Sequence, residues 1–388
     1  MNRISQLAAH KTVSAVLSTF PSQIEEVLDL TIAIQQIPAP TFAEAKRADF
    51  IQTQFTAAGL TDVMQDELGN VYGRHPSAAL THPPVIISAH SDTVFPAGTD
   101  LTVQRDDKYI HGPGISDNSA GVAGIIHLAK TLRNFNFELP ANVWFVSNVG
   151  EEGLGDLRGM RAAVQRFGSQ AIYLVVEGGL YGQISHQAIG VRRFKITVET
   201  PGGHSWGSFG SRSAIHEIGR IIVAIDQLPT PKTPKTTYNV GVIEGGTSIN
   251  TIAQSASLLL DCRSERMVEL ERLVTAVTQI VKQANKRKDV TVTMEMIGNR
   301  PAGAISREAE LVQMVEAALK AVGCRTPHFI ASSTDANIPL SEGMSAVCIG
   351  LAESNNAHRL DEYLNPKNLA NGLGQLLLLT LATAGYGA

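Results

Sequence analysis

The sequence predicts an α/β protein in which a mostly parallel sheet is interrupted by a smaller inserted domain. Three observations support this fold class. Between residues 84 and 177, short apolar runs rich in β-branched residues alternate with a helical stretch. From residue 191 to residue 300, the elements follow the order βαββαβ. Helix and strand then resume, so we expect a discontinuous larger domain, residues 1–190 plus 301–388, with residues 191–300 inserted into it.

Three runs in the first part of the larger domain are typical of buried parallel strands, because each is apolar and ends in polar or charged residues. The stretch between the first two runs has apolar residues at threefold and fourfold spacing, which predicts a helix. In parallel sheets, ligands bind beyond the carboxyl ends of the strands, so we expect a functional site there. The strands are PVIISAH, NVWFVSNV and AIYLVVEGG, and the helix is SAGVAGIIHLAKTLRNF.

The inserted segment predicts a ferredoxin-like unit of four strands and two helices. Its strands are VRRFKITVET, TTYNVGVIEGG, SASLLLDCRS and VTVTMEMIG, and its helices are RSAIHEIGRIIVAIDQL and MVELERLVTAVTQIVKQANKRK. After this unit, a further helix and a strand with a polar end return the chain to the larger domain. They are REAELVQMVEAALKAVG and AVCIGLAES.

The composition is that of an ordinary globular protein: 388 residues, 44% hydrophobic and 18% charged, with a formal net charge of −4. No block of basic residues with interleaved aromatics stands out, which argues against a nucleic-acid partner. The C-terminal tract LGQLLLLTLATAGYGA is too short to span a bilayer, so we expect a packed terminal helix and no membrane partner. The N-terminus lacks the pattern of a signal peptide, and the three cysteines are far apart, so we expect reduced thiols and a cytoplasmic protein.

Two adjacent carboxylates, Glu151 and Glu152, follow the apolar run VWFVSNV. Burying two like charges side by side is costly unless positive charge lies nearby. A metal would supply that charge, because four other strand-end segments each offer a metal-ligating side chain. These are His90 in SAHSDTV, Asp117 in GPGISDNSAG, Glu177 in VVEGG and His358 in NNAHRLDEY.

The set contains more ligands than one tetrahedral zinc ion takes, but it suits two divalent ions. Asp117 is the natural bridge between them. His90 and Glu177 would complete the site of one ion, and Glu152 and His358 the site of the other. Zinc is the default metal for histidine and carboxylate ligands, and cobalt or manganese would suit the same site.

Glu151 is then left without a metal to bind, which favours a role as general base and acid on the attacking water and the leaving nitrogen. Asp92 lies two residues after His90, so both side chains share a face of an extended segment. Its carboxylate is placed to accept the free ring N–H of that histidine and to fix its tautomer.

These residues resemble the dinuclear zinc exopeptidase and amidohydrolase family, which includes peptidase T, glutamate carboxypeptidase, aminoacylase, acetylornithine deacetylase and succinyl-diaminopimelate desuccinylase. The family's His-x-Asp pattern is matched by His90-Ser91-Asp92, its bridging-aspartate motif by Gly114-Ile115-Ser116-Asp117-Asn118, and its base–ligand pair by Glu151-Glu152. The resemblance covers nearly the whole chain. It implies a zinc-hydrolase catalytic domain with an inserted lid and dimerisation domain.

Further expectations come from the resemblance alone. His204 in PGGHSWGS resembles a lid histidine that reaches the active site of the partner subunit, which implies a homodimer joined through the lids. Asn250 in GGTSIN matches a lid asparagine that binds substrate in relatives, although it is also placed to cap a turn. The peptide bond between Asp117 and Asn118 is expected to be cis.

The expected reaction is metal-assisted hydrolysis of an amide bond in a small substrate. The resemblance is nearest to peptidase T-like proteins, which favours a short-peptide exopeptidase. Peptidase T has aspartate at the fourth ligand position, however, whereas this chain has Glu177, as carboxypeptidases and N-acyl-amino-acid deacylases do. Arg263 would favour a substrate that ends in a carboxylate, if it is not simply a solvated lid residue. A homologue that binds a metal or ligand without turnover is the alternative from another class.

Overall fold

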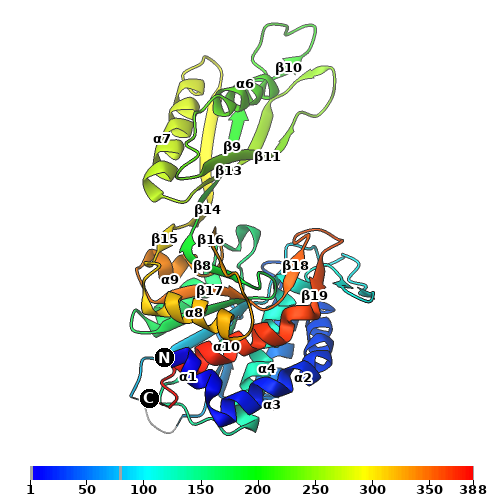
Figure 1. Ribbon diagram of the computed structural model, residues 1–388. Helices are drawn as coiled ribbons and strands as arrows, with labels where there is room; N and C mark the ends of the chain where they lie inside the picture. Colours follow the sequence, from blue (N-terminus) through cyan, green and yellow to red (C-terminus); the bar gives the residue numbers. More distant parts are fainter. Residues whose placement is uncertain (1–2, 78–80, 388) are drawn as a thin grey trace. The chain divides into compact units, whose positions relative to one another are not determined.

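The structure, a computed structural model, describes residues 3–77 and 81–387. It divides into two compact units. The larger unit comprises Met1–Ala188 and Ala304–Ala388, and the smaller unit comprises Ile189–Gly303 (Figure 1). That the first is a catalytic domain and the second a dimerisation lid stays a prediction.

The larger unit is built on one large mixed sheet. Over the described part of the chain its strand order is β1-β2-β6-β3-β7-β17-β8-β15, with β16 paired to β8. The central strands β6, β3, β7 and β17 run parallel, and antiparallel pairing joins β1 to β2, β2 to β6, and β8 to β17. The predicted fold class, α/β with a mostly parallel central sheet, is confirmed. The strands are β1 Thr61–Gln65, β2 Val71–His75, β3 Val85–His90, β6 Val143–Asn148, β7 Ile172–Glu177, β8 Gln183–Ala188, β15 Gly303–Ala304, β16 His328–Ser332 and β17 Ala346–Gly350.

Helices cover both faces of this sheet, which is why its central strands are apolar on both sides. In β3, for example, Ile87 packs into the core shared with α1, α2, α3, α4, α8 and α10, whereas Ile86 packs into the core shared with α5 and α9. The first helix layer consists of α1 Arg3–Ala9, α2 Lys11–Gln35, α3 Ala45–Ala57, α4 Ala120–Asn134, α8 Glu310–Ala321 and α10 Leu369–Thr383. The second consists of α5 Arg158–Phe167 and α9 Asn337–Ser341.

The strand register aligns the carboxyl ends of the parallel strands. His90, the last residue of β3, pairs with Asn148, the last residue of β6. Glu177, the last residue of β7, pairs with Gly350 at the end of β17. The loops that follow these strands therefore leave from one edge of the sheet, as expected for the binding edge of an α/β protein.

A small antiparallel sheet in the same unit, in the order β18-β19-β5-β4, connects two of these loops. Its strands β5 and β19 place the turn before α4 beside the loop that carries His358. The strands are β4 Gln104–Arg105, β5 Ile110–His111, β18 Glu353–Asn355 and β19 Tyr363–Asn365, and short helical turns lie at Ile115–Ser119, Gly153–Gly155 and Pro366–Asn368.

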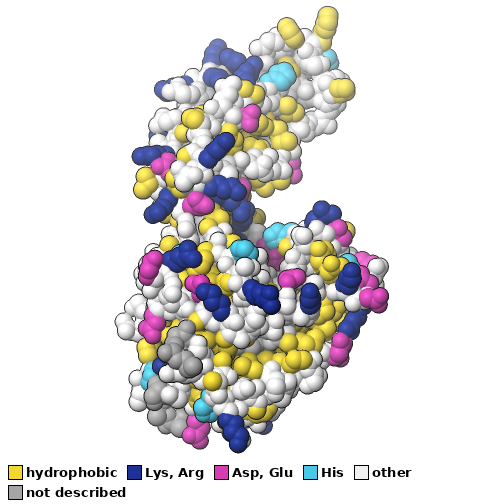
Figure 2. All heavy atoms as spheres, viewed as in Figure 1, with side chains coloured by type: hydrophobic (Ala, Val, Ile, Leu, Met, Phe, Trp, Pro, Cys, Tyr) yellow, Lys and Arg dark blue, Asp and Glu magenta, His cyan; other side chains and the backbone are white. Residues whose placement is uncertain are grey.

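The smaller unit has the predicted βαββαβ order. Its antiparallel sheet has the order β11-β13-β9-β14, and α6 and α7 pack on one face to form a separate core. Trp206, Phe209 and Ile249 are almost fully exposed near a two-stranded ribbon of β10 and β12, and Figure 2 shows apolar side chains that protrude from this end of the unit. The elements are β9 Gly190–Glu199, β10 Gly203–His204, α6 Ala214–Asp226, β11 Thr236–Gly245, β12 Thr251–Ile252, β13 Ser255–Ser264, α7 Met267–Ala284 and β14 Thr291–Arg300.

The apolar C-terminal tract forms α10, whose residues are nearly all buried, as the sequence predicts. Among the helices that the structure describes, none is both long and apolar enough to cross a membrane.

Candidate metal centre

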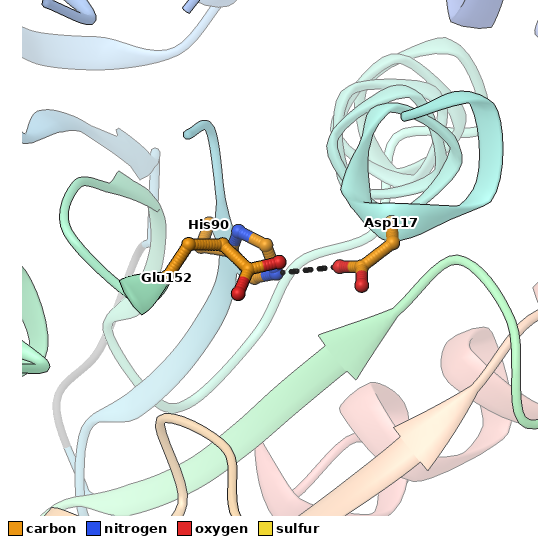
Figure 3. Close-up of side chains that lie close together, drawn as sticks. All are labelled: His90, Asp117 and Glu152. Atoms are coloured by element: carbon orange, nitrogen blue, oxygen red, sulfur yellow. Dashed lines mark ion pairs between the residues drawn. The ribbon is translucent and has the colours of Figure 1, made fainter. Parts of the chain in front are cut away.

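Three side chains of the predicted ligand set meet at the carboxyl edge of the large sheet (Figure 3). His90 comes from the end of β3, Asp117 from the turn before α4, and Glu152 from the loop after β6. One ligand atom from each of them lies within 4.8 Å of the others. Such a convergence of nitrogen and oxygen donors is what a divalent cation requires.

The remaining two predicted ligands extend this cluster on opposite sides of Asp117. Its Oδ1 lies 3.1 Å from His90 Nε2, which is also 3.7 Å from Glu177 Oε2. Its Oδ2 lies 3.1 Å from His358 Nε2, which is also 2.9 Å from Glu152 Oε1. Oδ1 of Asp117 therefore faces the histidine that is close to Glu177, and Oδ2 faces the histidine that is close to Glu152.

Burial and the neighbouring side chains shift the pKa values of both histidines, Asp117 and Glu177. Burial alone would favour the neutral form of His90, but hydrogen bonds to carboxylates outweigh it and raise its pKa well above the usual value. Hydrogen bonds to Asp117 and Glu152 raise the pKa of His358 to about 10. Burial opposes ionisation of Asp117, yet its two histidine contacts lower its pKa. Burial raises the pKa of Glu177 to about 7.

The donor set fits a pair of divalent metal ions. Two imidazoles and three carboxylates are borderline and hard ligands of the kind that zinc takes. The two oxygens of Asp117 are divided between two groups of donors, which is the arrangement that a shared carboxylate needs.

We expected the Asp92 carboxylate to accept the ring N–H of His90, but a backbone oxygen lies closer to this ring nitrogen. Its Nδ1 lies 3.1 Å from the backbone carbonyl oxygen of Asp92 and 3.5 Å from that residue's Oδ1. The main-chain oxygen is thus the closer acceptor for the ring N–H that fixes the tautomer.

The carboxylate of Asp92 instead organises the acidic pair. It accepts the backbone N–H groups of Glu151 and Glu152, each at 2.9 Å, and the hydroxyl of Thr41 at 2.8 Å. All three carboxyl groups belong to buried residues, with Glu151 6% exposed. Asp92 therefore sets the direction in which both glutamates leave the backbone, and sequence reasoning missed Thr41 because no spacing relates it to the site.

Asn118 ties the bridging turn to the end of β7. Its amide nitrogen donates to the carbonyl oxygen of Val176 at 2.9 Å, and its Oδ1 accepts the N–H of Gly178 at 2.7 Å. These two residues flank Glu177, so the side chain of Asn118 fixes the backbone on both sides of that carboxylate. The peptide bond between Asp117 and Asn118 is cis, as the resemblance implies.

A buried acid that the sequence did not single out, Glu362, holds the other side of the same turn. Its carboxylate accepts the backbone N–H groups of Gly114, Ser116 and Asp117. In the sequence Glu362 follows Asp361 in a polar segment, which is typical of a solvated pair of charges. Gly114 has a φ of 73°, and a Cβ there would lie 3.0 Å from Thr93 Cγ2, so the turn requires glycine at this position.

Three predicted site residues belong to the smaller unit. His204 lies on β10, where it pairs with Thr251 of β12, and Asn250 comes directly before β12; both are exposed. Arg263 is near the end of β13, and its Nε donates to Asp261 Oδ2 at 2.6 Å. Their roles toward the metal centre stay predictions.

Comparison with known proteins identifies one family. Its model, that of peptidase family M20/M25/M40, matches residues 86–381. The matched segment begins in β3 and ends in α10, so it includes every proposed metal ligand and the whole smaller unit.

Curated relatives are named for different activities. A DapE protein of Mycobacterium tuberculosis, assigned as a succinyl-diaminopimelate desuccinylase, is 25% identical over 357 residues, which is 88% of this chain and 94% of the relative. A protein of Arthroderma otae described as a probable carboxypeptidase is 27% identical over 247 residues, which is 58% of this chain and 53% of the relative.

Solved structures show the same fold at lower identity. The aminopeptidase PepT from Bacillus cereus superimposes with a TM-score of 0.74 at 21% identity, over 93% of this chain and 99% of that one. A tripeptidase from Staphylococcus aureus superimposes with a TM-score of 0.78 at 22% identity over the same shares. At these identities the likeness establishes the fold and leaves the substrate open.

Proposed function

The chain belongs to peptidase family M20/M25/M40, a family of metal-dependent hydrolases, and from this we propose that it is a co-catalytic dinuclear metallohydrolase that cleaves an amide bond in a small substrate. The observation that carries the proposal is the division of the Asp117 carboxylate between His90 and His358. The proposed ligands of one ion are His90, Asp117 and Glu177, and those of the other are Asp117, Glu152 and His358.

When bound, two divalent ions would polarise the scissile carbonyl and lower the pKa of the attacking water. Glu151 is the proposed general base and acid, because it is buried beside the proposed ligand Glu152 and has no assigned ion of its own. Its carboxylate takes the proton of the attacking water and delivers it to the leaving nitrogen. Asp92 keeps this carboxylate in place through the N–H of Glu151.

The leading assignment is that the protein is an exopeptidase and that its substrates are short peptides. The similar solved structures of an aminopeptidase and a tripeptidase support it. An N-acyl-amino-acid amidase or a carboxypeptidase is the second candidate, favoured by Glu177 at the fourth ligand position and by the curated relatives. Arg263 would serve such substrates, since a guanidinium has five N–H groups and can hold Asp261 through Nε while it binds a carboxylate through its terminal nitrogens.

We expect the zinc-loaded protein to release the N-terminal residue from tripeptides in a mixed panel of tripeptides and N-acyl amino acids. Products are read by mass spectrometry, with Glu151→Gln as the inactive control. Cleavage of the acyl amino acids alone would replace the peptidase assignment by the deacylase one. A wild-type protein that binds zinc and cleaves neither class would favour the non-catalytic alternative.

The proposed homodimer is supported by the surface of the smaller unit. In the described sheet β11 is an edge strand, and its residues Val242 and Ile243 are exposed. Exposed apolar edge strands are ready surfaces for pairing with another chain. In this arrangement His204 would stabilise the oxyanion in the partner's active site.

The double variant Val242→Lys, Ile243→Lys is therefore expected to sediment as a monomer in analytical ultracentrifugation, whereas the wild type sediments as a dimer. Its kcat is expected to fall by about 10²–10³-fold if the oxyanion donor comes from the partner. Val268→Lys, an exposed position on α7, is the matched control and is expected to stay dimeric and active. A wild-type monomer would contradict the dimer, and a fully active monomeric variant would contradict the role of His204.

A further inference from the structure

The side chain of Glu362 is a heavily hydrogen-bonded acid next to the proposed metal centre, and the proposed function gives it no role. Its side chain has no exposed surface. Oε1 accepts the N–H of Ser116 at 2.8 Å, the hydroxyl of Ser116 at 2.7 Å and the N–H of Asp117 at 2.9 Å. Oε2 accepts the N–H of Gly114 at 3.0 Å. A buried carboxyl group that accepts three backbone N–H groups and one hydroxyl anchors the backbone segment to which these donors belong.

The donors belong to the turn that presents Asp117. Residues 117 and 118 have non-helical backbone angles, so this stretch lacks the regular hydrogen bonds of the α4 helix that follows. The amides of Gly114, Ser116 and Asp117 point to Glu362 instead. The backbone that aims the Asp117 carboxylate is therefore held by a side chain 245 residues away in the sequence.

Glu362 also belongs to the segment that carries His358, four residues before it. Two backbone contacts lay this segment along the bridging turn: the N–H of Gly112 donates to the carbonyl oxygen of Glu362 at 2.9 Å, and Tyr363 pairs with His111. One side chain thus connects the two loops whose ligand atoms, Asp117 Oδ2 and His358 Nε2, face each other at 3.1 Å.

We propose that Glu362 is a positioning residue for the bridging carboxylate. It fixes the backbone of residues 114–117 so that the two oxygens of Asp117 face His90 and His358 at the same time. This role rests on the proposed dinuclear centre, and it acts through the backbone of Asp117 without contact between Glu362 and substrate or metal.

Glu362→Gln is the sharpest test, because glutamine keeps the shape of the side chain but replaces one acceptor oxygen by a donor that faces a backbone N–H. We expect its affinity for zinc to fall by about 10–100-fold, the usual effect of losing a partner that orients a ligand. We also expect a lower kcat with little change in KM and a changed visible absorption spectrum of the cobalt-substituted protein. Zinc affinity is measured by competition with a chromophoric chelator, and folding by circular dichroism.

Glu353→Gln is the matched control. Glu353 lies on β18 near the same segment, and its side chain accepts from Asn368. This variant is expected to keep the zinc affinity and the cobalt spectrum of the wild type, because its hydrogen bond supports no residue of the metal centre.

A folded Glu362→Gln variant with wild-type zinc affinity and an unchanged cobalt spectrum would overturn the proposal. If Glu362→Gln does not fold, Ser116→Ala takes its place, since it removes only the hydroxyl that donates to Glu362. We expect Ser116→Ala to weaken zinc binding to a smaller extent, and unchanged binding there would be equally decisive against the proposal. A wild-type protein that binds no zinc would instead overturn the dinuclear centre itself.

Discussion

Glu151→Gln is expected to lower kcat by about 10²–10⁴-fold, the range that a positioned general acid–base contributes. A carboxamide cannot take the proton of the attacking water, yet it has the size of the carboxylate that it replaces. The backbone N–H of residue 151 would still donate to Asp92, so Glu152 would keep its direction. Metal content is therefore expected to stay at the wild-type level.

The neighbouring residue provides the matched contrast. Glu152→Gln is the same chemical change one position along the chain, but it removes a carboxylate that lies 2.9 Å from His358. We expect this variant to lose one of the two zinc ions, whereas Glu151→Gln loses turnover alone. The measurements are kcat on the best substrate of the panel and zinc content by inductively coupled plasma mass spectrometry. Wild-type turnover by Glu151→Gln, or equal loss of zinc in both variants, would reject the division of roles.

The sequence predicts the central strands because strands buried on both faces consist of nearly continuous runs of apolar residues. Runs such as Val85–His90 and Ala346–Gly350 are mostly apolar, and each is buried along its whole length. The N-terminal helix α2, Lys11–Gln35, is harder to predict because Pro21 lies inside it. Proline usually marks the first turn or the end of a helix, but here the packed apolar side chains keep the helix continuous.

Most of the proposed metal ligands could be located from the sequence because they lie at or just after the end of a strand, where the residues change from apolar to polar. Asp117 could be located because it stands in a glycine-rich turn before a helix. No sequence pattern identifies the residues that hold these ligands in place. Asn118 acts on the backbone beside Glu177, and Glu362 acts on the backbone of Asp117 across 245 residues. Bonds from a side chain to a distant backbone depend on the fold, so they have no characteristic spacing in the sequence.

Asp92 illustrates the same limit. Its position two residues after His90 predicts a contact with the imidazole. The structure gives the nearer contact to the backbone carbonyl oxygen of Asp92 and directs the carboxylate to the N–H groups of Glu151 and Glu152. Those amides become available only once β3 and β6 lie side by side, which the local sequence around Asp92 does not determine.

Asp117→Ala is expected to lose both metal ions and with them all measurable turnover. The two oxygens of Asp117 face different imidazoles, each at 3.1 Å, so a single substitution removes one donor from each proposed ion. Glu177→Ala removes a carboxylate that lies beside His90, the proposed ligand of one ion. It is therefore expected to lose one ion and to retain the other.

Stoichiometry distinguishes a shared carboxylate from two independent sites. After dialysis against a weak chelator, we expect about two zinc ions per chain in the wild type, about one in Glu177→Ala and close to none in Asp117→Ala, because Asp117 would supply one oxygen to each ion. Circular dichroism checks that both variants remain folded. If Asp117→Ala kept one tightly bound ion, as Glu177→Ala is expected to do, Asp117 would serve a single ion and the centre would not be bridged through its carboxylate.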